Sequence, residues 1–287
     1  MSLLIGTVAG AFHLSDPTTP LISGTRINHI ARQDDGWWAV DGKGRLHHGS
    51  EVVAQAPDRV TLNCIQPSVE TVWIGAGEGR LFRLEDELVE DESFSDAPGR
   101  EEWYTPWGGP PDVRSMTVDA AGTLFVNIHV GGILRRYDRM FAPTLDQDAD
   151  VHQVLAHLTR PGVIFAACAL GLGQSSNGHD FVYREDGLHA TYCRAVATVG
   201  ETVLVSASTG PRTTRARLYR ANLDGGPLQP CTAGLPDWFD ENLDSHCLAT
   251  VDGSVYAGFD GTLWRSDDEG SSWAVAAEGL PKITCVA

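Results

Sequence analysis

The sequence predicts an all-β fold in which seven four-stranded antiparallel sheets close into a ring, one domain over residues 1–287. Three observations predict it. A strand–turn–strand pattern recurs with a period of roughly forty residues, which is typical of a β-propeller. A short apolar strand precedes each hairpin. Finally, the last short strand has no hairpin after it, and the first hairpin has no strand before it.

The clearest hairpin lies near the C-terminus and serves as a template. Its apolar runs, residues 255–258 and 263–265, are separated by Asp260-Gly261, a strong signal for a tight hairpin turn. Related patterns start at Leu4, Gly36, Val72, Leu124, Ile164 and Val203. The sequence therefore contains about seven such units, as expected for a seven-bladed β-propeller.

Short apolar strands are expected before the hairpins at residues 27–31, 62–65, 113–116, 151–154, 192–195 and 245–248. A seventh, residues 283–287, ends the chain. We expect it to pair with the N-terminal hairpin of residues 4–13, because this closure completes one blade and leaves no open sheet edge.

A turn motif, Ser266-x-Asp268-x-Gly270-x-Ser272-Trp273, follows the template hairpin. Its hydroxyl and carboxylate can bond the backbone amides of the turn, its glycine can take a positive φ, and its indole can fill the gap between hairpins. A partial copy occurs at residues 174–181, with Ser176 in place of the aspartate.

With these repeats, the motif resembles the Asp-box of the bacterial neuraminidase repeat. That superfamily includes sialidases, xyloglucanase-type glycoside hydrolases, sortilin-type receptors and a photosystem assembly factor. The resemblance implies a propeller over the whole chain, with the box on the face opposite the active site. Glycan hydrolysis is one implied function. The chain nevertheless lacks the Phe-Arg-Ile-Pro motif and any recognisable Tyr and Glu nucleophile pair, has about one blade more than a sialidase, and has only one of the two propellers that form the xyloglucanase cleft.

The composition restricts the partners. The formal net charge of −17 argues against nucleic acid and anionic membranes, because both require a basic surface. No apolar run is long enough to cross a bilayer, and the N-terminal segment has the alternation of a strand and no cationic lead-in. The six cysteines form no CxxC pair, so we expect free thiols and a cytoplasmic protein.

Alignment of the short strands places polar residues in one ring at a mouth of the channel. The ring consists of Asn28-His29, Asn63-Cys64, Arg114-Ser115, His152-Gln153, Cys193-Arg194, His246-Cys247 and Thr284-Cys285. Two interpretations are open. The ring lines a wet ligand pocket, or its side chains simply bond channel water.

His129 lies where a strand gives way to the loop on the mouth side, and His152 starts the inner strand of the next blade, so the two should be neighbours. Together with His246, or with His29 or Cys193, they could supply the ligands of a zinc, copper or iron ion with an open position for substrate. The same histidines could also act as a general acid or base, or simply bond the backbone.

Arginines and aromatic residues complete the predicted site. Arg114 and Arg194 could hold a carboxylate or phosphate through a bidentate guanidinium. Arg212 lies in a long loop and is either a substrate-binding residue or an exposed charge. In the long connections 95–112 and 234–244, the aromatic residues Trp103, Trp107 and Trp238 form either a lid or pocket wall, or caps on the blade ends.

The function predicted from these residues is a small-molecule enzyme, hydrolase- or lyase-like, with His129, His152, Arg114 and Arg194 as catalytic groups and a divalent metal ion as an option. Two alternatives are a sialidase-like glycoside hydrolase and a non-catalytic propeller that binds a protein or glycan. A glycosidase would use two carboxylates from Glu101, Glu102, Asp112, Asp150, Asp237 and Asp240, but no spacing singles out a pair.

Overall fold

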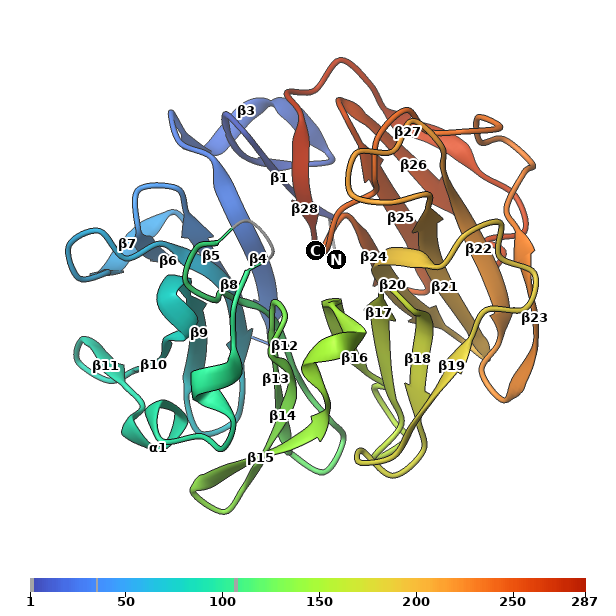
Figure 1. Cartoon of the computed structure of the whole chain (residues 1–287). Coiled ribbons are helices and arrows are strands. Elements are labelled where there is room, and N and C mark those ends of the chain that lie inside the picture. Colours follow the sequence, from blue (N-terminus) through green and yellow to red (C-terminus); the bar gives the residue numbers. More distant parts are fainter. Residues whose placement is uncertain (1–2, 35, 106–107) are drawn as a thin grey trace.

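The computed structural model describes residues 3–34, 36–105 and 108–287. Seven four-stranded antiparallel sheets surround a central channel, as Figure 1 shows, which confirms the predicted seven-bladed β-propeller. Blades 1 to 3 are β28 (Ile283–Val286) with β1 (Leu4–Thr7), β2 (Gly10–His13) and β3 (Asp16–Ser23); β4 (Ile27–Gln33), β5 (Gly36–Asp41), β6 (Arg45–His48) and β7 (Glu51–Gln55); and β8 (Leu62–Pro67), β9 (Val72–Ala76), β10 (Leu81–Leu84) and β11 (Leu88–Glu90).

Blades 4 to 7 continue around the ring. They are β12 (Val113–Val118), β13 (Leu124–Ile128), β14 (Gly132–Tyr137) and β15 (Met140–Leu145); β16 (Val151–Ala156), β17 (Ile164–Cys168), β18 (Gly171–Ser175) and β19 (Phe181–Arg184); β20 (Tyr192–Val199), β21 (Thr202–Ser208), β22 (Ala216–Asn222) and β23 (Gly225–Pro230); and β24 (Leu248–Val251), β25 (Ser254–Phe259), β26 (Thr262–Ser266) and β27 (Ala274–Ala277). A short helix, α1 (Glu92–Ser95), follows blade 3.

The ring closes through the two ends of the chain. Strand β28 pairs antiparallel with β1, with Val286 opposite Ile5 and Cys285 opposite Gly6. Beyond this ladder, the amide of Leu4 donates to the carbonyl of Ala287 over 2.7 Å. Figure 1 places both termini beside the channel. The predicted closure is therefore confirmed, and blade 1 has an inner strand like every other blade.

The inner strand of blade 7 begins three residues later than predicted. The expected strand at residues 245–248 begins only at Leu248, because His246 has a φ of 67°, in the left-handed region that interrupts an extended strand. The amide of Cys247 donates to the carbonyl of Asp244 and closes a turn there. This turn brings His246 into the channel instead of into a sheet.

The Asp-box turn has the predicted local structure. The amide of Gly270 donates to Ser266 Oγ over 2.8 Å, and the amide of Ser272 donates to the Asp268 carboxylate over 2.8 Å. Trp273 is buried in the apolar cluster between blades 6 and 7. The register of the partial copy differs from the prediction, because Asn177 takes the place of the aspartate by accepting from the amides of His179 and Asp180.

The core consists of apolar clusters between neighbouring blades. All six cysteines are buried and unpaired, as predicted. Within the described ranges, none of the helices combines the length and apolar character needed to span a membrane.

Candidate metal centre

The first residues of the inner strands lie at one mouth of the channel, here called the upper mouth. Here polar side chains hold neighbouring blades together by donating to a backbone carbonyl of the next inner strand. The pairs are Asn28 with Leu62 (2.7 Å), Asn63 with Val113 (3.3 Å), Asn127 with Val151 (3.1 Å) and Thr284 with Ile27 (2.6 Å). Part of the predicted polar ring therefore has a structural role, satisfying backbone groups at the channel edge.

His152 makes the same kind of inter-blade contact but has a second nitrogen to spare. Its Nδ1 lies 2.7 Å from the carbonyl oxygen of Cys193. Because a carbonyl only accepts, Nδ1 carries the proton and Nε2 presents a lone pair. His152 is fully buried, and its Nε2 has no hydrogen-bond partner among the residues that the structure describes. A buried nitrogen of this kind is costly unless something else, such as a metal ion, occupies its lone pair.

Two further side chains converge on this lone pair. Asp150 Oδ2 lies 3.7 Å from His152 Nε2, and Asp150 Oδ1 lies 3.3 Å from His129 Nε2. One ligand atom from each residue lies within 4.8 Å of the other two. His129 follows β13 in blade 4, whereas Asp150 and His152 belong to the start of β16 in blade 5. The sequence analysis anticipated that the two histidines would be neighbours, and the structure brings them together.

The backbone around this cluster is held in unusual conformations. Asp150 has φ 44° and ψ 68°, and Val130, directly after His129, has φ 47°. A left-handed β-branched residue is rare and strained, and such residues concentrate at functional sites. The carbonyl of Val130 accepts from the amide of Tyr104, and the carbonyl of Asp150 accepts from the amide of Ala169 over 3.2 Å. The surrounding structure thus fixes the directions of His129 and Asp150.

The charges in the cluster suit a cation. Burial alone would raise the pKa of Asp150, but the hydrogen bond from His129 and the charges of His152 and Arg114 outweigh it and lower the pKa. Burial, reinforced by Arg114, lowers the pKa of His152 to about 3. At neutral pH the cluster therefore offers a carboxylate and a neutral imidazole, the forms in which these groups bind metals.

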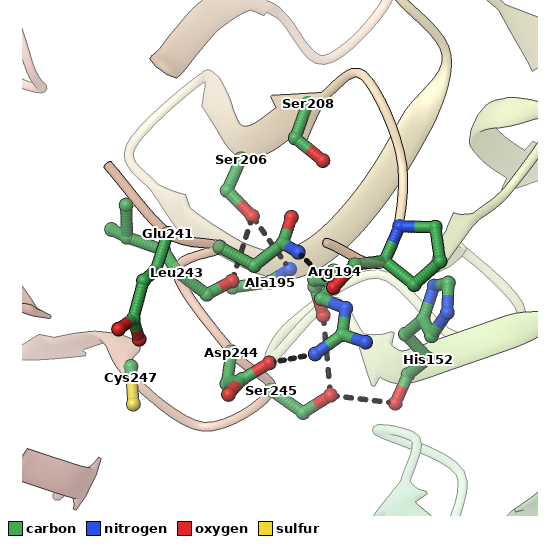
Figure 2. Close-up of polar contacts among 12 residues, drawn as sticks. His152, Arg194, Ala195, Ser206, Ser208, Glu241, Leu243, Asp244, Ser245 and Cys247 are labelled. Atoms are coloured by element: carbon green, nitrogen blue, oxygen red, sulfur yellow. Dashed lines mark hydrogen bonds and ion pairs between the residues drawn. The ribbon is translucent and has the colours of Figure 1, made fainter. Parts of the chain in front are cut away.

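Arg194 lies beside the cluster, on the inner strand of blade 6. Figure 2 shows its guanidinium paired with Asp244, and Ser245 donating to the carbonyl oxygens of His152 and Arg194 over 2.8 and 3.3 Å. The connection between blades 6 and 7 thus delivers two polar residues to the upper mouth. The sequence analysis singled out neither Asp244 nor Ser245, because their position depends on the turn before β24.

Tyr192 is a third residue at the upper mouth that the sequence pattern did not single out. Its ring meets the ring of His152 edge-on, with centroids 4.6 Å apart, and its hydroxyl accepts from Arg194 Nη2 over 3.3 Å. Tyr192 opens the predicted inner strand of blade 6, next to Cys193. Its position at the start of the inner strand was a signal in the sequence. The predicted ring, however, contained only the two residues that follow this position in each strand.

His246 does not join His129 and His152, contrary to the predicted ligand set. Its ring packs against that of His29, with centroids 3.8 Å apart and the ring planes tilted by 30°, and its Nε2 donates to the carbonyl oxygen of Arg114 at 3.3 Å. Gln153 Oε1 accepts from the amide of His246 over 3.1 Å. The left-handed turn at His246 thus places its ring in the channel, against His29. The third member of the cluster is Asp150.

The predicted aromatic lid also differs from the structure. Trp103 is buried in the core cluster between blades 3 and 4, where it packs against Phe94. Trp238 lies between two guanidinium groups, those of Arg215 at 4.4 Å and Arg217 at 4.2 Å. Both tryptophans match the alternative in which they cap blade ends, because each finds an apolar or cationic neighbour away from the channel.

The other predicted residues fall in different places. Arg212 is exposed in its loop, and Trp107 lies outside the described residues. Among the six carboxylates considered for a glycosidase pair, Asp150 joins the cluster, Asp112 is half-buried near it, and Glu101, Glu102, Asp237 and Asp240 are exposed.

Comparison with known proteins supports the fold and leaves the family open. No protein-family model and no curated protein matches the chain. A proposed 6-phosphogluconolactonase from Bacteroides uniformis is similar in structure, with a TM-score of 0.64 and 13% identity over 100% of this chain and 98% of that one. Virginiamycin B lyase from Staphylococcus aureus has a TM-score of 0.62 and 10% identity, covering 89% of this chain and 85% of the lyase. The WD40 propeller of Doa1 has a TM-score of 0.63 and 13% identity, covering 95% and 83%.

These similarities show a propeller fold. They do not place the chain among the Asp-box propellers, so that likeness rests on the turn motif alone.

Proposed function

We propose that this protein is a small-molecule hydrolase or lyase that binds a divalent metal ion at His129, Asp150 and His152. The observation that carries the proposal is the buried Nε2 of His152. Within the described ranges it has no hydrogen-bond partner, and it lies near a carboxylate shared with a second histidine. Two imidazoles and one carboxylate form a ligand set used by catalytic zinc and by non-haem iron, with positions left for water and substrate.

Cys193 does not fit as a ligand in this proposal. It is fully buried, and burial raises the pKa of its thiol, which disfavours the thiolate that a metal binds. The proposed set therefore contains only nitrogen and oxygen donors. Such a set favours Zn²⁺ or Fe²⁺ over the thiolate-dependent copper sites.

The chemistry proposed for the site follows from its groups. A metal ion there would polarise a carbonyl or phosphoryl oxygen and lower the pKa of a bound water molecule. The inter-blade bond of Nδ1 to Cys193 would hold the His152 ring in the orientation a ligand needs. Asp112 is the candidate proton carrier, because it is a half-buried carboxyl beside the cluster and burial, only partly opposed by its neighbours, raises its pKa above the ordinary value.

The structural comparisons are compatible with this proposal. Two of the similar propellers are described as a lactonase and a lyase, and a histidine-to-alanine variant of the lyase is catalytically inactive. At 10–13% identity, these proteins show only that the fold accommodates hydrolysis and elimination. The assignment to this chain depends on its own histidine and aspartate cluster.

Metal binding tests the first half of the proposal. The protein is stripped with a chelator, titrated with Zn²⁺ and with Fe²⁺ under anaerobic conditions, and analysed for bound metal. We expect one ion per chain in the wild type and none in His152→Asn. His189→Asn is the matched control, since His189 bonds Tyr219 away from the cluster. Equal metal binding by His152→Asn and the wild type, or none by the wild type, would refute the site.

The reaction class is tested separately with the metal-loaded protein. A panel of lactones, esters and β-substituted acids is incubated with it, and product formation is followed by mass spectrometry. The proposal expects turnover that the chelator abolishes and that Zn²⁺ or Fe²⁺ restores. A protein that binds metal stoichiometrically but converts no member of the panel would support the binding-scaffold alternative instead.

A further inference from the structure

We propose that the substrate of this site carries an oxyanion group, a carboxylate or a phosphate, and that Arg114 alone binds it. The inference rests on the proposed function, because it concerns the same mouth of the channel. It also refines the sequence prediction, in which Arg114 and Arg194 were equivalent anion receptors. The structure distinguishes the two arginines by their partners.

Arg194 already has its counter-charge. One guanidinium nitrogen pairs with Asp244, and another donates to the hydroxyl of Tyr192 over 3.3 Å. The guanidinium also lies 5.5 Å from the centroid of the Tyr192 ring. Its side chain is only 17% exposed. These contacts hold Arg194 as part of the wall, with its charge already balanced by Asp244.

Arg114 has no such partners. It is the second residue of β12, and its backbone carbonyl is fixed by His246 Nε2 on the opposite side of the channel. Its side chain is half-buried, and its guanidinium makes no hydrogen bond or ion pair with any residue in the described ranges. Five donors on a partly desolvated guanidinium are therefore available for a ligand.

The surrounding charges leave Arg114 short of negative neighbours. Burial and the nearby Arg194 lower its pKa, and the opposing effects of Asp244 and Asp150 do not balance them. Both of those carboxylates have closer partners, Arg194 for Asp244 and His129 for Asp150. Bringing an oxyanion to Arg114 would relieve this imbalance, and the planar guanidinium matches a carboxylate or phosphate with two parallel hydrogen bonds.

Arg114 is close enough to the metal cluster for their charges to interact. The charge of Arg114 acts on both Asp150 and His152, and it acts also on Asp112. A ligand bound to Arg114 therefore lies beside the cluster, so that the anionic group and the reacting bond belong to one compact molecule. The predicted substrate class is a small carboxylic acid or phosphate ester whose scissile bond lies near its anionic group.

The test measures anion binding without metal. Chelator-treated wild type is titrated with inorganic phosphate and, in a second arm, with acetate, using calorimetry at low ionic strength. We expect saturable binding in at least one arm, and the arm with higher affinity identifies the anion. Arg114→Gln should weaken that binding at least tenfold, whereas Arg139→Gln, which changes an exposed arginine in the turn between β14 and β15, should leave it unchanged.

Two further measurements separate this inference from the metal proposal. His152→Asn should lose metal but still bind the anion, and Arg114→Gln should still bind one metal ion. Thermal unfolding of each variant checks that it folds. The inference is overturned if the wild type shows no saturable binding in either arm, or if Arg114→Gln and Arg139→Gln bind equally. A wild type that binds the anion but no metal ion would instead count against the metal site and leave the anion site supported.

Discussion

The Nδ1 atom of His152 lies 2.7 Å from the carbonyl oxygen of Cys193, so this side chain joins blade 5 to blade 6. In blades 2 and 3 the equivalent contact is made by an asparagine, Asn28 or Asn63. An amide is sufficient for the inter-blade bond. A histidine at this position keeps the bond and adds a second nitrogen, directed to Asp150.

This dual role predicts different outcomes for two substitutions. His152→Ala removes the inter-blade bond and leaves a buried carbonyl without its donor, which should lower the free energy of unfolding by about 2 kcal/mol. His152→Asn can restore the bond and should cost less than about 1 kcal/mol. Urea unfolding of the metal-free proteins measures both. Equal destabilisation by alanine and asparagine would contradict the structural role of Nδ1.

Gly131 is predicted to control the position of His129. A Cβ added at residue 131 would lie 2.5 Å from Ile128 Cγ2 and 3.0 Å from Trp103 Cγ, both buried. Gly131→Ala should therefore shift the segment that carries His129, lowering stability by about 1–3 kcal/mol and metal affinity about tenfold. Gly36→Ala, whose nearest neighbour would be His48 Nε2 at 3.4 Å, is the control. Unchanged metal affinity in Gly131→Ala would show that the loop does not position the ligand.

His29 and His246, whose rings pack together in the channel, should make the folded protein less stable in mild acid. Burial lowers the pKa of His246 to about 4, from an ordinary value of 6.5, and the pKa of His29 is lowered as well. Above pH 6.5 both histidines are neutral in the folded and unfolded chain. As the pH falls from 6.5 towards 4, only the unfolded chain takes up the proton, so His246 alone lowers the free energy of unfolding by up to about 1.4 kcal/mol per pH unit.

His246→Asn tests this origin of the acid sensitivity. Asparagine tolerates the left-handed conformation of residue 246, where φ is 67°, but it does not titrate. Urea unfolding at pH 7.5, 6 and 5 should show a shallower decline for the variant than for the wild type. Parallel declines would assign the acid sensitivity to other groups.

The Asp-box is predicted to contribute to stability and not to activity. Ser266 is buried, and its Oγ accepts from the amide of Gly270 and donates to Asp268 over 2.9 Å. Ser266→Ala should lower the free energy of unfolding by about 1–2 kcal/mol and leave metal binding unchanged. Ser271→Ala, in the same turn but exposed, should have little effect. A change in metal binding in Ser266→Ala would contradict a purely structural role.

The architecture could be predicted from the sequence because a propeller repeats local patterns. Asp260-Gly261 specifies a tight turn wherever it lies, and the alternation around it specifies two strands. Such signals depend on neighbours in the chain and therefore survive without tertiary information. The lone strand at residues 283–286 predicted the closure for the same reason, since an unpaired apolar strand requires a partner.

The site was only partly predictable. Position within the repeat placed His129 and His152 on neighbouring blades. It did not show that Asp150 and not His246 lies with them, because the left-handed residue 246 delays the start of β24 until Leu248. Likewise, nothing in the sequence distinguished Arg114 from Arg194. Arg194 is paired with Asp244, which lies in a long connection between blades.

The sequence by itself thus determined the seven repeats, their strands and the ring, since these follow from periodicity and turn chemistry along the chain. Only the tertiary structure decided which polar groups find partners across blades and which do not. The unpaired nitrogen of His152 and the unpaired guanidinium of Arg114 are of the second kind, among the described residues, because hydrogen bonding between blades depends on distances that no local pattern encodes.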